Sequence, residues 1–189
     1  EEGLSNIGAS VSDQITSDAI TSVLVALIGI LLYVAIRFEM GYAIGAVVAT
    51  VHDVLMTVGL FVLLGTISGG TLCSGQFTAP MIASILMIVG YSINDTVVVF
   101  DRIREYITER PKTALEENVN EAVSSTLSRT LMTSVTTLLV VLILFFFGGP
   151  DLKSLSFALI VGIIVGTYSS IFVATPLAVD FLKRKEANK

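Results

Sequence analysis

The chain has 189 residues, of which 53% are hydrophobic and only 14% are charged, and its mean hydropathy is +0.86. This hydropathy excludes an ordinary soluble domain and predicts a membrane protein. The net charge of −5 says little about partners, and the single cysteine, Cys73, excludes a disulfide framework and a cysteine-based metal site.

Five apolar stretches are each long enough to cross a bilayer, which takes about 18 residues. Because they follow one another with short connections, membrane spans are favoured over buried helices of a soluble protein. The predicted spans are about 19–36, 40–65, 77–100, 130–147 and 154–179. We therefore expect an all-α transmembrane domain over residues 19–182, with an external lead-in at 1–18 and a tail at 183–189.

Basic residues gather on one side of the predicted spans. That side includes Arg37, the connection 101–128 and the tail, whereas the other side carries Lys153 alone. The positive-inside rule makes the basic side cytoplasmic, together with the C-terminus. Five spans then place the polar N-terminal segment outside. Because that segment does not resemble a signal peptide, we expect a further span before it in a longer chain.

The cytoplasmic connection 101–128 is predicted to be largely helical. The third helix continues to about Glu109, because no helix breaker comes before Pro111. Beyond it, apolar residues recur at helical spacing and predict an amphipathic helix on the cytoplasmic surface or beneath the bundle. Its apolar face consists of Leu115, Val119, Ala122, Val123 and Leu127.

Asp95 is the first of the ionisable residues inside the spans. Such a group costs about 3 kcal/mol in a membrane, and Asp95 lies five residues before Phe100, about 8 Å from the charged edge of its span. Tyr91 and Ser92 share its helix face, whereas Asn94 points about a quarter turn away. This pattern predicts a protonatable carboxylate facing the bundle interior. The alternative is a structural acid bonded to a neighbouring helix.

Arg129 opens the fourth span, and a row of hydroxyls follows it on the same face, at Thr133 and Thr136. The row indicates a wetted track or a polar contact between helices, whereas Arg129 alone could simply extend to the cytoplasmic surface. Because the third and fourth spans approach the same membrane face, Arg129 and Asp95 could pair, or approach each other in one protonation state only.

His52 and Asp53 lie near the middle of the second span. Asp53 shares a small, polar packing face with Ala49, Thr50, Met56 and Thr57. The two residues either fix helix register or handle protons, and they are too few to bind a metal ion.

The sequence contains no phosphate-binding loop, no nucleophile with a positioned base and no basic patch for nucleic acid. We therefore expect no catalytic residues, no cofactor and no nucleic-acid partner. A buried acid beside a threonine row is most economically explained by proton transit, since one charge crossing the membrane releases about 2.3 kcal/mol per 100 mV.

The stretch "GYSINDTVVVFDRIRE" closely resembles the signature of the SecF family, the smaller subunits of the bacterial SecD–SecF protein-export complex. The segments "ASVSDQITSDAI", "IRFE", "ATVHDVLMTVG" and "LSRTLMTSVTTLLVV" agree in the family's order and cover nearly the whole chain. The resemblance implies an RND-type six-helix membrane bundle, of which this chain matches the last five helices. These 189 residues depart from the family by lacking the first helix and the external domain, unless those parts lie outside them in a longer chain, and the chain could be the tail of a SecD–SecF fusion.

The resemblance further implies a multi-pass protein of the bacterial cytoplasmic membrane that uses the proton-motive force to promote protein export. Its implied partners are SecD, the SecYEG channel, translocating polypeptides and the lipid bilayer. The family's proton-pathway residues correspond to Asp95, Arg129 and Thr133, while Asn94, His52 and Asp53 are secondary candidates. The alternatives are an RND-type half-transporter for small molecules and a structural assembly subunit.

Overall fold

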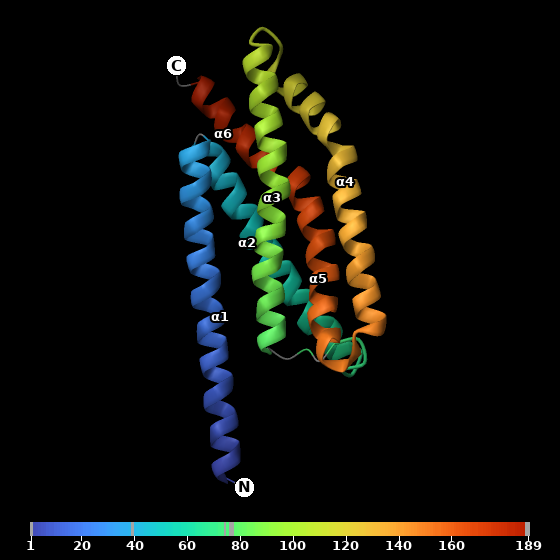
Figure 1. Ribbon diagram of the computed structural model, residues 1–189. Coiled ribbons are helices and arrows are strands. Elements are labelled where there is room, and N and C mark those ends of the chain that lie inside the picture. Colours follow the sequence, from blue (N-terminus) through green and yellow to red (C-terminus); the bar gives the residue numbers. More distant parts are fainter. Residues whose placement is uncertain (1, 39, 74, 76–77, 188–189) are drawn as a thin grey trace.

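The computed structural model describes residues 2–38, 40–73, 75 and 78–187. Over these residues the chain folds into long helices joined by short connections (Figure 1). Five of the helical rods are long and apolar enough to cross a membrane, as the sequence predicts. The elements are α1 (Glu2–Arg37), α2 (Met40–Ile67), α3 (Ala79–Glu109), α4 (Leu115–Phe147), α5 (Gly149–Ser169), the π-helical turn η1 (Ser170–Ala174) and α6 (Thr175–Ala187).

The helix α3 lies at the centre of the bundle, in contact with α1, α2, α4, α5 and η1. The elements α5, η1 and α6 follow one another as a single rod, which extends the fifth predicted span. The α1–α2 turn, the α3–α4 loop and the end of α6 gather at one end of the bundle (Figure 1). The start of α1 and the α2–α3 and α4–α5 connections point to the opposite end.

The helices α1 and α4 extend far beyond their predicted spans because no breaker interrupts them. The helix α1 includes residues 2–18, which the sequence predicts only as an external lead-in. The predicted amphipathic helix is the first part of α4, so it is not a separate element. Its residues Val119 and Ala122 are buried against Phe100 and Ile103, so this segment packs beneath the bundle. The third helix ends at Glu109, as predicted.

Glycine allows close approach at two helix contacts. A Cβ on Gly45 of α2 would lie 2.9 Å from the carbonyl oxygen of Ala174 and 3.3 Å from the backbone nitrogen of Ala178. A Cβ on Gly162 of α5 would overlap with Cδ1 of Ile88 on α3. The absence of a side chain at these two positions brings α2 against η1 and α6, and α5 against α3.

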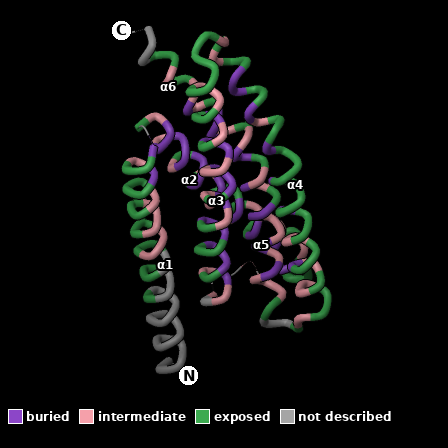
Figure 2. The backbone as a smooth tube through the Cα atoms, turned by 45° about the horizontal axis from the view of Figure 1, so that its top comes forward, coloured by how far each residue is buried: buried purple, intermediate pink, exposed green. Residues whose placement is uncertain are grey.

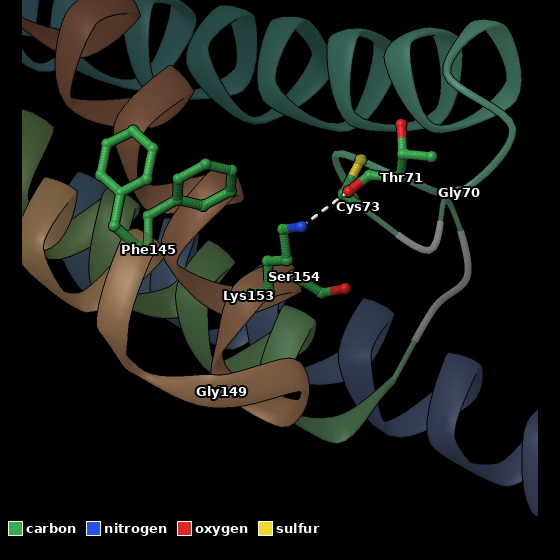
Figure 3. A pocket seen from close by; sticks show the side chains of 8 residues that line it. Gly70, Thr71, Cys73, Phe145, Gly149, Lys153 and Ser154 are labelled. Carbon is green, nitrogen blue, oxygen red and sulfur yellow. Dashed lines mark hydrogen bonds between the residues drawn. The ribbon is translucent and has the colours of Figure 1, made fainter.

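At the end of the bundle opposite the basic side, a lysine joins α5 to the α2–α3 connection. Lys153 Nζ of α5 donates a 2.8 Å hydrogen bond to the carbonyl oxygen of Thr71 in the α2–α3 connection, beside a cavity of about 490 Å³ (Figure 3). Cys73 lies in the same connection, and burial raises the pKa of its thiol. The thiol is therefore held in its unreactive protonated form.

Burial is concentrated on the inner helices (Figure 2). In the span window Ile20–Arg37 of α1, only Val34 is fully buried. The outer face of α4 is also exposed and apolar, with Met132, Val140 and Phe147 at 65%, 67% and 85% exposure. In a membrane protein such faces contact lipid or another polypeptide.

The Gly45 contact provides a test of this packing. Gly45→Ala should lower the free energy of unfolding by about 1–3 kcal/mol, because the new methyl group meets backbone atoms that cannot rotate away. Thermal unfolding in detergent measures the change. Gly59→Ala is the matched control, since Gly59 lies on the same helix with no heavy atom within 4 Å of its added Cβ. That control should be neutral or stabilising, and equal losses in both variants would contradict the packing.

Candidate functional site

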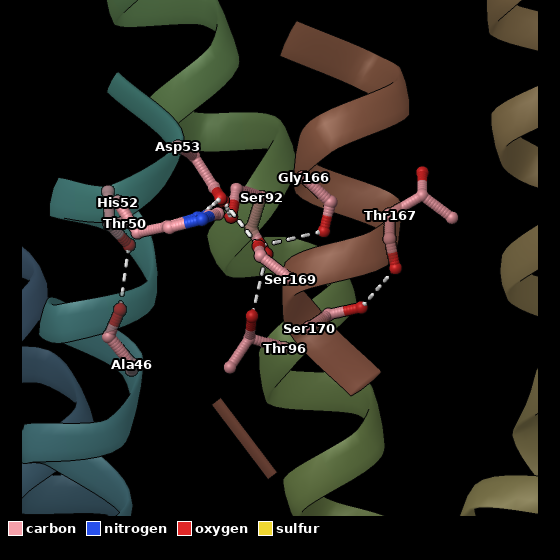
Figure 4. Close-up of polar contacts among 10 residues, drawn as sticks. All are labelled: Ala46, Thr50, His52, Asp53, Ser92, Thr96, Gly166, Thr167, Ser169 and Ser170. Carbon is pink, nitrogen blue, oxygen red and sulfur yellow. Dashed lines mark hydrogen bonds and ion pairs between the residues drawn. The ribbon is translucent and has the colours of Figure 1, made fainter. Parts of the chain in front are cut away.

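The buried centre of the bundle is organised around the carboxylate of Asp53 on α2, which is fully buried. Its Oδ2 accepts hydrogen bonds from Ser92 Oγ of α3 at 2.5 Å and from Ser169 Oγ of α5 at 2.7 Å (Figure 4). Its Oδ1 lies 3.0 Å from Nδ1 of His52, whose side chain is about one-third exposed. One carboxylate thus connects three helices.

Asp53 lies on the inner face of α2 together with the small and polar residues that share its helix face. Ala49, Thr50 and Thr57 are buried with it, as the spacing predicts, whereas Met56 is 43% exposed. Ser169 reaches Asp53 from the last residue of α5, immediately before the π-helical turn. The donors satisfy a group that would otherwise be costly in a bilayer.

A second group of hydrogen-bonded side chains lies where α3 meets α4 and α5. Tyr91 donates a 2.9 Å hydrogen bond to Ser134 Oγ of α4, and that oxygen lies 2.7 Å from Thr167 Oγ1 of α5. Hydroxyl groups therefore connect α3, α4 and α5 within an otherwise apolar interface.

Asp95 lies one helical turn from Tyr91 and is 5% exposed, so its predicted interior position agrees with the structure. Its Oδ2 has no hydrogen-bond partner among the described residues, and neither does Oγ1 of the buried Thr130 on α4. The contacts Tyr91–Ser134 and Arg102–Ser125 set the antiparallel register of α3 and α4. This register places Asp95 level with Thr130, so two unpaired polar atoms lie at one level of the interface.

Arg129 and Thr133 are on the exposed side of α4, next to the buried Thr130 and Ser134. Thr133 Oγ1 is bonded to its own helix, through the carbonyls of Arg129 and Thr130. Within the described part of the chain, Arg129 and Asp95 form no ion pair.

Asn94 is exposed and lines a shallow groove between α3 and α1, away from Asp95. The structure therefore brings Asp53 and Asp95 onto neighbouring faces of the core. It leaves Arg129, Thr133 and Asn94 on surfaces of the chain.

A polar groove of about 450 Å³ opens between α1, α3 and α4 at the basic end of the bundle. Its charged lining consists of Arg37, Asp101, Arg102, Glu105 and Arg129, and it continues along α3 to Val98 and Val97. Val98 is three residues from Asp95, about 4.5 Å along the helix axis. The groove therefore reaches within one helical turn of the buried acid.

Four polar residues of the core contacts were not among the predicted site residues: the buried Thr130, Ser134 and Ser169 and the partly buried Thr167. Ser169 follows the close-packing glycines of α5 at helical spacing, and this small, polar face is the signal that marks it. Thr130 and Ser134 have no comparable signal, because every face of the fourth span carries a hydroxyl.

Comparison with known proteins resolves the family. Residues 2–184 match the family described as protein export membrane protein SecD/SecF, C-terminal. The chain belongs to this family.

SecD/SecF relatives resemble the chain in both sequence and structure. Protein translocase subunit SecF of Rhodothermus marinus is 52% identical over 183 residues, which cover 97% of this chain and 58% of that protein. Protein translocase subunit SecDF of Thermus thermophilus is 43% identical over 97% of this chain and 24% of its own length. A crystal structure of SecDF in its super-membrane-facing form superposes with a TM-score of 0.80 at 46% identity, covering 89% of this chain and 22% of that one.

These findings confirm the resemblance and the all-α membrane fold. The chain is a multi-pass membrane protein that spans a little more than half the length of the SecF relative.

The hydroxyl chain across α3 can be tested by removing one oxygen. Tyr91→Phe should lower the free energy of unfolding by about 1 kcal/mol, because it removes one buried hydrogen bond and leaves Ser134 without its donor. Tyr33→Phe is the control, since Tyr33 is 57% exposed. Equal melting temperatures for the two variants in detergent would show that the Tyr91 bond does not support the interface.

Proposed function

We propose that this chain is the membrane part of a subunit of the Sec protein-export machinery, and that it uses the proton-motive force to promote polypeptide translocation across the cytoplasmic membrane. Support comes from relatives named protein translocase subunits SecF and SecDF. The observation that carries the proton-coupling part is the buried Asp95 carboxyl, whose Oδ2 lacks a partner one helical turn from a charged groove.

Protonation changes what Asp95 can do at the α3–α4 interface. A carboxylate only accepts hydrogen bonds, whereas a protonated carboxyl also donates one. At the level of Asp95, Thr130 Oγ1 offers an unpaired acceptor. Loading a proton therefore removes the cost of a buried charge and supplies a donor to α4. Unloading restores the attraction to Arg129.

Arg129 and Thr133 act as the cytoplasmic side of this pathway. Arg129 lines the groove and its charge acts on Asp95, so it stabilises the ionised acid after the proton leaves. Thr133 continues the same face of α4 by one turn. Asn94 is assigned to the wall of the α1–α3 groove. None of these steps makes or breaks a covalent bond other than to hydrogen, so the proposed subunit is not an enzyme and requires no cofactor.

The exposed faces of α1 and α4 supply contacts for SecD and the lipid bilayer, while SecYEG and the translocating polypeptide are the further partners. We place the α3–α4 loop and the end of α6 in the cytoplasm, since the basic residues gather there. Ion pairs Arg37–Asp101, Arg110–Glu121 and Lys183–Glu116 lie at the same end, as expected for a surface in water.

Asp95→Asn tests the function. The variant should assemble normally, because asparagine has nearly the same volume, but it should lose the part of export that depends on the proton-motive force. The measurement compares translocation of a secreted protein into membrane vesicles with and without a proton gradient. Asp180→Asn is the control, because Asp180 is exposed on α6, does not line the groove, and its surface ion pair with Arg184 contributes little.

Normal gradient-dependent export by Asp95→Asn would contradict the proposal and favour a structural subunit. Loss of small-molecule efflux with protein export intact would favour a half-transporter instead.

A further inference from the structure

We propose that Asp53 is a positioning residue for Asp95: by accepting hydrogen bonds from Ser92 and Ser169, its carboxylate fixes the rotation of α3 and holds Asp95 toward α4. This inference rests on the proposed function, in which Asp95 carries the proton. It assigns to Asp53 a task that does not require it to carry one.

The first step is the helical geometry of α3. Ser92 and Asp95 are three residues apart, so their side chains project about 60° from each other around the helix axis. Ser92 is bonded to Asp53 of α2 at 2.5 Å. Once that bond fixes the rotation of α3 about its own axis, the direction in which the Asp95 side chain projects is fixed as well.

The second step is that α3 is anchored from two sides. Ser92 is bonded toward α2, and Tyr91 is bonded toward Ser134 of α4. Both anchors lie within about one turn of Asp95, on the side away from the basic end. Rotation of α3 that would turn Asp95 out of the α3–α4 interface must break at least one of them.

The third step is the contact with α5. Ser169 donates to the same oxygen of Asp53 as Ser92 does, at 2.7 Å. A Cβ on Gly166 would lie 3.4 Å from Cβ of Ser92 and 3.7 Å from Asp53 Oδ2, so this part of α5 packs directly against both residues. The carboxylate of Asp53 therefore joins the donors of α3 and α5 at a point where α2, α3 and α5 meet.

The groups around Asp53 suit a carboxylate that acts as a hydrogen-bond acceptor. Within the described residues, Asp53 pairs with no lysine or arginine, and its charged or titratable contact is His52 on its own helix. The groups that face it from α3 and α5 are the neutral hydroxyls of Ser92 and Ser169. Tyr168, the titratable neighbour of Ser169, is 56% exposed and stacks on Phe172.

The experiment measures the reactivity of Asp95 itself. A membrane-soluble carbodiimide modifies carboxyl groups, and mass spectrometry of the Asp95 peptide gives the modification rate in native membranes with the complete complex. Ser92→Ala and Ser169→Ala should each raise that rate by about tenfold, the factor that corresponds to one hydrogen bond to a charged acceptor. Both variants should also lose gradient-dependent export.

Asp53→Asn separates positioning from proton transfer. The asparagine oxygen can accept from both serines, so this variant should keep a near-normal Asp95 modification rate and most of the export, whereas Asp53→Leu should lose both. Thr50→Val is the control, since among the described residues the buried Thr50 hydroxyl bonds to its own helix alone, at the carbonyl of Ala46. It should match the unmodified protein in both measurements.

Two results would overturn the proposal: an unchanged Asp95 modification rate in both serine variants, or an Asp53→Asn variant as inactive as Asp53→Leu. The second result would make Asp53 a proton carrier. Because the modification rate does not depend on export, it reports on positioning even if Asp95→Asn shows that the proposed function is wrong.

Discussion

The structure depends on one constraint: a carboxylate buried among membrane helices must obtain its hydrogen-bond donors from the protein, because hydrocarbon supplies none. Asp53 meets this requirement with the hydroxyls of Ser92 and Ser169. Because these donors come from α3 and α5, satisfying one acid of α2 also sets the positions of three helices. Ser169 lies between Gly166, which packs against Ser92, and the π-helical turn.

Asp95 is the contrasting case within the same core. It is buried on α3, but its Oδ2 has no hydrogen-bond partner among the described residues, and neither has Oγ1 of Thr130 on α4. An acid whose bonds are complete has little to gain from a change of protonation, whereas an acid with an unmet bond gains a partner. This difference, together with the groove that reaches Val97, supports the proposal that Asp53 has a structural task and Asp95 carries the proton. The exposed position of Arg129 and Thr133 on α4 requires a covering partner before that pathway is enclosed.

Much of this arrangement can be predicted from the sequence, and the remainder depends on tertiary contacts. The lengths of the apolar stretches predict the five spans. The absence of a breaker before Pro111 predicts that α3 continues to about Glu109. The small and polar residues that share a helix face with Asp53 predict that this face is buried. The partners of Asp53 could not be predicted, because a serine in an apolar helix commonly bonds to its own backbone. Arg129 and Thr130 are adjacent, so their side chains project about 100° apart around the axis of α4. Which of the two points inward is decided by how α4 packs on α3 and α5, and the sequence alone does not give that packing. The continuous length of α4 was missed because its amphipathic and apolar segments have different patterns but no break between them.

The most direct measurement of the central claim is an infrared difference spectrum of the protein in membranes as the external pH is stepped from alkaline to acidic. Carboxyl bands can be assigned by subtracting the spectra of the Asp95→Asn and Asp53→Asn variants. The account predicts a protonated carboxyl band that appears on acidification and is absent from the Asp95→Asn protein, with no such band assigned to Asp53. A band that instead disappears in the Asp53→Asn protein, with none from Asp95, would reverse the two roles and contradict the account.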